Sequence, residues 1–156
     1  MEEKTNVMRF LDQKKISYES HNYTGTRAIS GMEVAHALGK DPKEVFKTLV
    51  TLGKSGKNYV FLLPVAEELD LKKGAKAVKE KKIEMLAGKD LLPLTGYIHG
   101  GCSPLGMKKT FTTVIDETAQ ERGNIIFSGG KIGYQVEMKL EDLKKVLRFT
   151  FADLKK

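Results

Sequence analysis

The sequence predicts an α+β fold in which a mixed, partly closed β-sheet is flanked by helices. Short apolar runs rich in β-branched and aromatic residues predict several strands, and segments with helical apolar spacing are grouped around them. The chain has 156 residues, 40% of them hydrophobic, so it can bury a core of its own. It has no linker rich in Pro, Gly or Ser and no internal repeat. We therefore expect one domain over residues 1–156.

The N-terminal part is expected to contain a helix followed by a strand. The apolar residues between positions 7 and 11 would share one helix face, which predicts a helix over residues 3–14. A strand over residues 16–23 comes next, and residues 24–27 have the composition of a turn.

Two further helix starts are predicted from capping patterns. Ser30 and Glu33 have the spacing of a capping box, which opens a short helix that ends at Gly39. Pro42 and Glu44 predict a second helical turn, because proline is favoured at the first helical position.

The central and C-terminal parts are expected to alternate between strands and helices. Strands over residues 48–52 and 59–65 are joined by a hairpin-type connection, and Asp70 caps a lysine-rich helix that reaches Lys79. The remaining predicted elements are a strand at 82–86, a helical turn at 90–94, strands at 112–115, 125–127 and 134–138, and a closing helix at 140–147.

Composition excludes several classes of protein. A single cysteine, Cys102, excludes an intramolecular disulfide and a multi-cysteine zinc cluster. No apolar run approaches the ~20 residues of a membrane span, and Met1–Lys4 does not resemble the start of a signal peptide. We expect a cytoplasmic protein without a membrane segment.

The net charge indicates the kind of partner. Lys and Arg number 27 against 20 acidic residues, which gives a formal charge of +7. Such an excess suits a polyanion, because Lys and Arg replace the counterions condensed along phosphates. The alternative is a lysine-rich surface that is simply solvated.

The loop at residues 96–109, GYIHGGCSPLGMKK, is the most informative segment. Adjacent Gly100 and Gly101 allow the backbone to lie against a ligand, and Ser103 adds a hydroxyl. Lys108 and Lys109 follow as cations. The pattern predicts a loop that offers N–H groups to an anion or a carbonyl oxygen.

Two other segments repeat this chemistry. Residues 128–131 combine Ser, two glycines and Lys, and residues 46–50 place Lys47 and Thr48 at the mouth of an apolar strand. Lys47 beside N–H-rich loops would suit an ester carbonyl next to a phosphate. On its own, a lysine at a strand start ordinarily extends into solvent.

These three segments, in this order, resemble the YbaK/EbsC family, the free-standing relatives of the editing domain of bacterial prolyl-tRNA synthetases. His21–Tyr23 and Leu69–Lys73 also match, so the resemblance covers nearly the whole chain. It implies a distorted, barrel-like mixed sheet and a hydrolase that clears misacylated tRNA. The YbaK branch removes cysteine from tRNA for proline.

The resemblance also implies which residues form the site. Lys47 matches the residue most closely tied to deacylation, acting on either the carbonyl or a phosphate, and Gly100 and Gly101 would supply catalytic N–H groups. The expected substrate-binding residues are Tyr23, Thr48, Ser103, Ser128, Gly129, Gly130 and Lys131, and the candidates for tRNA backbone contact are Lys72, Lys73, Lys76, Lys108 and Lys109.

No catalytic dyad, metal or cofactor is expected. Ser103 lies outside any GxSxG motif, and Cys102 beside glycines is more typical of a packed residue than of a nucleophile. His21, His36 and His99 have no metal-ligand spacing with Asp, Glu or Cys. The resemblance offers a mechanism without such groups, in which the substrate's own thiol attacks its ester and expels tRNA as a cyclic thioester.

Alternatives remain open for substrate and function. Better-known YbaK members have a longer, acidic loop where this chain has residues 24–27, and a basic residue where it has Ile132. Ala-tRNA(Pro) is therefore an alternative substrate to Cys-tRNA(Pro). A non-catalytic tRNA- or nucleotide-binding module and a cell-wall or regulatory protein are the other hypotheses. Expected partners are tRNA and prolyl-tRNA synthetase, while the oligomeric state is not determined by the sequence.

Overall fold

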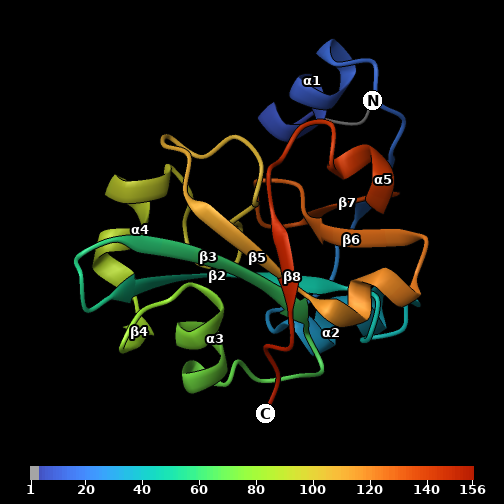
Figure 1. Ribbon diagram of the computed structural model, residues 1–156. Helices are drawn as coiled ribbons and strands as arrows, with labels where there is room; N and C mark the ends of the chain where they lie inside the picture. Colours follow the sequence, from blue (N-terminus) through green and yellow to red (C-terminus); the bar gives the residue numbers. More distant parts are fainter. Residues whose placement is uncertain (1–3) are drawn as a thin grey trace.

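The computed structural model describes residues 4–156 as two β-sheets with helices packed around them (Figure 1). In chain order the elements are α1 (Asn6–Gln13), β1 (Glu19–Asn22), α2 (Gly31–Ala37), β2 (Phe46–Gly53), β3 (Asn58–Pro64), α3 (Leu71–Ala77), β4 (Ile83–Met85), α4 (Gly88–Thr95), β5 (Thr112–Asp116), the 3-10 turn η1 (Glu117–Glu121), β6 (Asn124–Ser128), β7 (Tyr134–Lys139), α5 (Leu140–Leu143) and β8 (Thr150–Ala152).

The larger sheet is mixed, as expected. Its strand order is β4-β2-β3-β5-β8, with antiparallel pairing from β4 to β3 and parallel pairing from β3 to β8. β2 and β3 form the predicted hairpin, with a register that runs from Phe46–Pro64 to Leu52–Asn58. The smaller sheet, β1-β7-β6, is antiparallel throughout.

The two sheets meet at one corner instead of closing into a barrel. A parallel bridge joins Val45, just before β2, to Ile126 in β6, and the Ile126 N–H donates to the Glu44 carbonyl at 3.3 Å. The α+β class with a mixed sheet and flanking helices is confirmed, and its closure is limited to this corner.

The core follows from the two faces of the central strand β3. Leu62 is fully buried in the main cluster, which includes Leu11 of α1 and Phe127 of β6. Phe61 and Leu63 point to the other face and pack in a second cluster with Leu154 near the C-terminus. Burial on both faces explains why residues 59–65 form a continuous apolar run.

The predicted caps form at their expected positions. Ser30 and Glu33 make both hydrogen bonds of a capping box at the start of α2. Asp70 accepts the N–H groups of Lys72 and Lys73 at the start of α3. The first helix has Thr5 as its N-cap, and the predicted start at Glu3 lies outside the described residues.

Three elements differ from the sequence predictions. Residues 42–44 form a hydrogen-bonded turn instead of a helix, because Val45 is recruited into the bridge between the sheets. The closing helix ends at Leu143. Strand β8, which was not predicted from the sequence, pairs in parallel with β5 at the edge of the larger sheet. Within residues 4–156 no helix has the length and apolar character to cross a membrane.

The fully buried Asp116 connects β8 and the C-terminal segment to the sheet. One carboxylate oxygen accepts the Leu154 N–H at 2.9 Å, and the other accepts the Thr118 N–H and hydroxyl at 3.2 and 2.6 Å.

Replacing Asp116 with Ala should lower the free energy of unfolding by about 1–3 kcal/mol, because it leaves a buried N–H unpaired. Urea titration followed by circular dichroism measures this. Glu68→Ala, at the exposed ion pair with Lys156, should leave the midpoint close to that of wild type. Equal loss in both variants would contradict the assignment.

Candidate functional site

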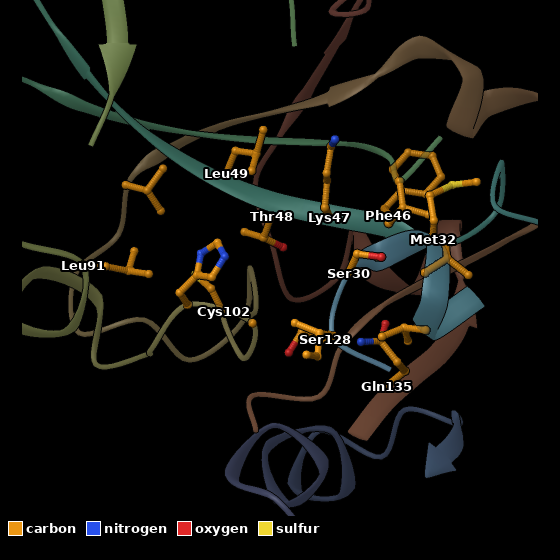
Figure 2. A pocket seen from close by; sticks show the side chains of 18 of the residues that line it. Ser30, Met32, Phe46, Lys47, Thr48, Leu49, Leu91, Cys102, Ser128 and Gln135 are labelled. Carbon is orange, nitrogen blue, oxygen red and sulfur yellow. The ribbon is translucent and has the colours of Figure 1, made fainter. Parts of the chain in front are cut away.

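A cavity of about 400 Å³ opens between β2, α2 and the loops that contain Gly100 and Ser128 (Figure 2). Its volume lies within the range of small-molecule sites. Its walls are mostly apolar, and its polar lining residues are Tyr23, Ser30, Lys47, Thr48, His99, Ser128 and Gln135. Of the residues expected at the site, Tyr23, Lys47, Thr48, Gly100 and Ser128 are brought together here.

Lys47 and Thr48 leave β2 on opposite sides, as the alternation of a strand requires (Figure 2). Thr48 is on the side of Cys102 and Ser128. Burial lowers the pKa of the Lys47 ammonium, an effect opposed by the carboxylates of Glu68 and Glu67. Lys47 therefore borders the cavity as a partly desolvated cation.

Two buried polar atoms in the cavity wall have no hydrogen-bond partner within residues 4–156. They are Oγ1 of Thr48 and Oε1 of Gln135. An unpaired buried polar atom costs about 1–3 kcal/mol, so a ligand that pairs with these atoms gains from their prior desolvation. The two atoms thus define a place for a polar ligand.

Gln135 was not identified by the sequence analysis. It lies in β7 and is only 7% exposed. A lone polar residue in a strand ordinarily indicates a solvent-facing position, so no local signal separated Gln135 from a surface residue. Its position emerges only because β7 lies beneath the cavity.

The two expected glycine amides have different environments. Gly100 is exposed, lines the cavity, and has an N–H without a partner among residues 4–156. Gly101 is buried, and its N–H donates to the Ile98 carbonyl at 3.0 Å. The expectation that both N–H groups face a ligand therefore fits Gly100 and does not fit Gly101.

Gly101 instead allows the two glycine-rich loops to pack together. A Cβ at this position would lie 3.2 Å from the backbone nitrogen of Ile132 and 3.4 Å from Lys131. Glycine is thus favoured by the close approach of two backbones, because a Cβ would fit only if one of them shifted slightly. In the second loop, Gly130 has a φ of +94°, and a Cβ there would come within 2.9 Å of Val7.

Ser103 and Cys102 are poorly placed for covalent chemistry. Ser103 is fully buried, lies outside the cavity lining, and accepts the Leu105 N–H at 3.3 Å, so it acts as a turn hydroxyl. Cys102 lines the cavity, but burial raises the pKa of its thiol to about 12. The thiol is therefore protonated at neutral pH.

The Ser128 loop contributes one side chain to the cavity. Ser128 is 8% exposed, and its Oγ accepts the Gly130 N–H at 3.1 Å. Gly129, Gly130 and Lys131, which were expected to bind substrate, are not among the lining residues. The Lys131 ammonium lies 5.9 Å from the centre of the Tyr134 ring.

None of the lysines expected to contact tRNA lines the cavity. Lys72, Lys76 and Lys109 are exposed. Lys73 is engaged within the molecule, because its ammonium donates to Asp153 at 2.9 Å and to the Lys155 carbonyl at 2.7 Å. The Lys108 ammonium donates to the Pro93 carbonyl at 3.5 Å.

Comparisons with known proteins agree with this fold. A family model described as an aminoacyl-tRNA editing domain matches residues 27–146. A protein of Enterococcus faecalis, named as a proposed Cys-tRNA(Pro)/Cys-tRNA(Cys) deacylase, EbsC, is 44% identical over 154 residues, covering 98% of this chain and 94% of that protein.

Two solved structures have the same fold. The crystal structure of a proposed trans-editing enzyme for prolyl-tRNA synthetase superimposes with a TM-score of 0.82 at 22% identity, covering 99% of both chains. A scaffold from computational epitope grafting has a TM-score of 0.84 at 24% identity, covering 96% of this chain and 94% of that one.

The protonated state of Cys102 can be tested directly. Because burial raises the pKa of the thiol to about 12, the reactive thiolate forms only at strongly alkaline pH. Iodoacetamide should therefore label the native protein slowly at pH 8 and rapidly after denaturation. Mass spectrometry gives both rates. Native labelling as fast as that of the denatured chain would contradict this assignment.

Proposed function

The chain belongs to the aminoacyl-tRNA editing domain family, and on this premise we propose that it is a trans-editing deacylase for misacylated tRNA, with Cys-tRNA(Pro) as its main substrate. The 44% identity over nearly the whole chain to a protein named for this activity supports the substrate. The chain would act as one editing domain in the cytoplasm.

The observation that carries the proposal is the set of unpaired polar groups in the cavity. Gly100 N–H and the Thr48 hydroxyl can donate to the carbonyl oxygen of an aminoacyl ester, where negative charge develops. Gln135 Oε1 can accept from the α-ammonium of the same ester. The apolar wall then receives a small aminoacyl side chain.

The site lacks the groups of ordinary hydrolysis. Within the described residues 4–156, neither Asp nor Glu lines the cavity, so His99 has no carboxylate partner there. Cys102 is protonated and Ser103 is buried outside the lining. A reaction in which the substrate supplies the nucleophile is consistent with this chemistry.

In that reaction the cysteinyl sulfur forms a bond to its own ester carbonyl carbon. The bond from this carbon to the ribose oxygen breaks, and the tRNA leaves as a free hydroxyl. The proton lost by the thiol balances the proton gained by the ribose oxygen. Water then opens the cyclic thioester to cysteine. The protein contributes position and charge stabilisation through Gly100 and Thr48.

Lys47 would hold the terminal phosphate of the tRNA. Its departure from β2 on the side opposite Thr48 favours the phosphate over the carbonyl among its two expected roles. The exposed lysines Lys72, Lys76 and Lys109 are candidates for the remaining tRNA backbone. Prolyl-tRNA synthetase is the proposed partner that would supply tRNA selection.

Substrate choice tests the mechanism. Cys-tRNA(Pro) should be deacylated much faster than Ser-tRNA(Pro) at neutral pH, because a hydroxyl is a far weaker nucleophile than a thiol. Release of free amino acid from radiolabelled tRNA measures both rates, with Ala-tRNA(Pro) as a third substrate. Equal rates for Cys and Ser would indicate water activated by the protein. Preference for Ala would support the alternative substrate, and binding without turnover would support a non-catalytic module.

Lys47→Ala should lower kcat/KM about 10- to 150-fold, the equivalent of one charge-assisted hydrogen bond of ~1.5–3 kcal/mol. Lys76→Ala, on the exposed face of α3, should weaken apparent tRNA affinity and its salt dependence while turnover persists. Circular dichroism controls for folding. Wild-type activity in Lys47→Ala together with an inactive Lys76→Ala would mean that the site lies elsewhere.

A further inference from the structure

A cluster of two carboxylates and one imidazole lies on the smaller sheet, outside the lining of the cavity. We propose that Glu19 and His21 of β1 and Glu137 of β7 bind a divalent transition metal ion of the zinc class. Each residue offers one ligand atom, and these three atoms all lie within 4.8 Å of one another. The His21 Nε2 and the Glu137 Oε1 are only 2.8 Å apart.

The antiparallel register brings these residues together. Glu19 is directly opposite Glu137, and His21 lies two residues further along β1 on the same face. Glu137 is 116 residues from His21 in sequence, so no local spacing of residues predicts this cluster. The cross-strand pairing is part of the sheet itself, which holds the three backbones at constant positions.

The donor set matches the preference of zinc. Zn²⁺ binds imidazole nitrogen and carboxylate oxygen at about 2.0–2.2 Å, which in tetrahedral geometry separates the ligand atoms by roughly 3.3 Å. The present separations of up to 4.8 Å require only rotamer adjustments of the side chains. Two carboxylates and one neutral imidazole carry the charge that neutralises a divalent cation, and water can complete the shell.

The surroundings of Glu137 support the same assignment. The Asn124 amide donates to its second oxygen, Oε2, at 3.1 Å, and so orients the carboxylate as outer-shell partners of metal ligands do. Glu19 and Glu137 are like charges opposite each other, an arrangement that a nearby cation stabilises.

Lys40 places a cation beside the Glu137 carboxylate. Its ammonium lies 3.5 Å from Glu137 Oε1, and its side chain is 30% exposed. A long side chain with this exposure can move outward when a divalent ion takes its place. Lys40 therefore competes with the metal, and its removal should strengthen binding.

The test is titration of the full chain with Zn²⁺ by calorimetry, and with Co²⁺ by its visible absorption, which reports coordination directly. Wild type should bind one ion per chain. His21→Ala should weaken binding by about tenfold or more, and Lys40→Met should strengthen it. His36→Ala is the matched control, because His36 is exposed on α2 and is not one of the three clustered ligand residues, and it should bind like wild type.

Glu19→Gln is a second variant that distinguishes loss of a metal ligand from loss of folding. Glu19 is exposed, so this variant should keep the thermal midpoint of the ion-free protein while losing affinity. Unchanged affinity in both His21→Ala and Glu19→Gln, or a wild type that binds no ion, would overturn the proposal; in that case the cluster is an ion-pair network alone. The readout is metal binding, so either outcome leaves the deacylase proposal untouched.

Discussion

The corner at which Val45 and Ile126 join the two sheets is the constraint on which the rest of the site depends. Both residues are 1% exposed, and they pack with Ala35 of α2 and Val65. This small apolar contact sets β2 and α2 over the sheet that contains β6 and β7. The cavity is the space left where the sheets diverge from that corner, so its walls come from segments that are distant in sequence.

The glycine-rich loops serve this arrangement in two different ways. Gly101 has a structural role, because the backbone of residues 131–132 leaves little room for a side chain at this position. Gly100, one residue earlier, is exposed and lines the cavity, and its N–H has no hydrogen-bond partner among residues 4–156. A glycine pair can thus contain one residue that allows two loops to pack and one that lines the cavity, and the motif alone does not separate them.

The cavity combines burial with incomplete hydrogen bonding. The Thr48 hydroxyl oxygen and the Gln135 side-chain carbonyl oxygen are buried and have no hydrogen-bond partner among residues 4–156, so a ligand that pairs with them removes an unfavourable burial of polar atoms. Burial acts on the charged and nucleophilic groups in a related way, since it lowers the pKa of Lys47 and raises that of Cys102. In the proposed mechanism the site therefore positions the substrate and stabilises charge, and the lining residues within 4–156 include no activated nucleophile.

Local sequence patterns were enough to predict the class of fold, the caps at Ser30 and Asp70, the β2–β3 hairpin and the two glycine-rich loops, because each depends on short-range spacing and local backbone preference. Which of these residues meet depends on contacts between distant segments. Gln135 enters the cavity, Gly101 and Ser103 turn inward, and Lys73 is engaged by Asp153 through contacts made across the fold. The turn at residues 42–44 and strand β8 could not be predicted from local sequence either. Val45 pairs with a strand of the smaller sheet, and Thr150–Ala152 pairs with β5, and in both cases this pairing outweighs the local preference. The energy of pairing between distant strands leaves no pattern within one short segment, so these two elements could be recognised only in the folded structure.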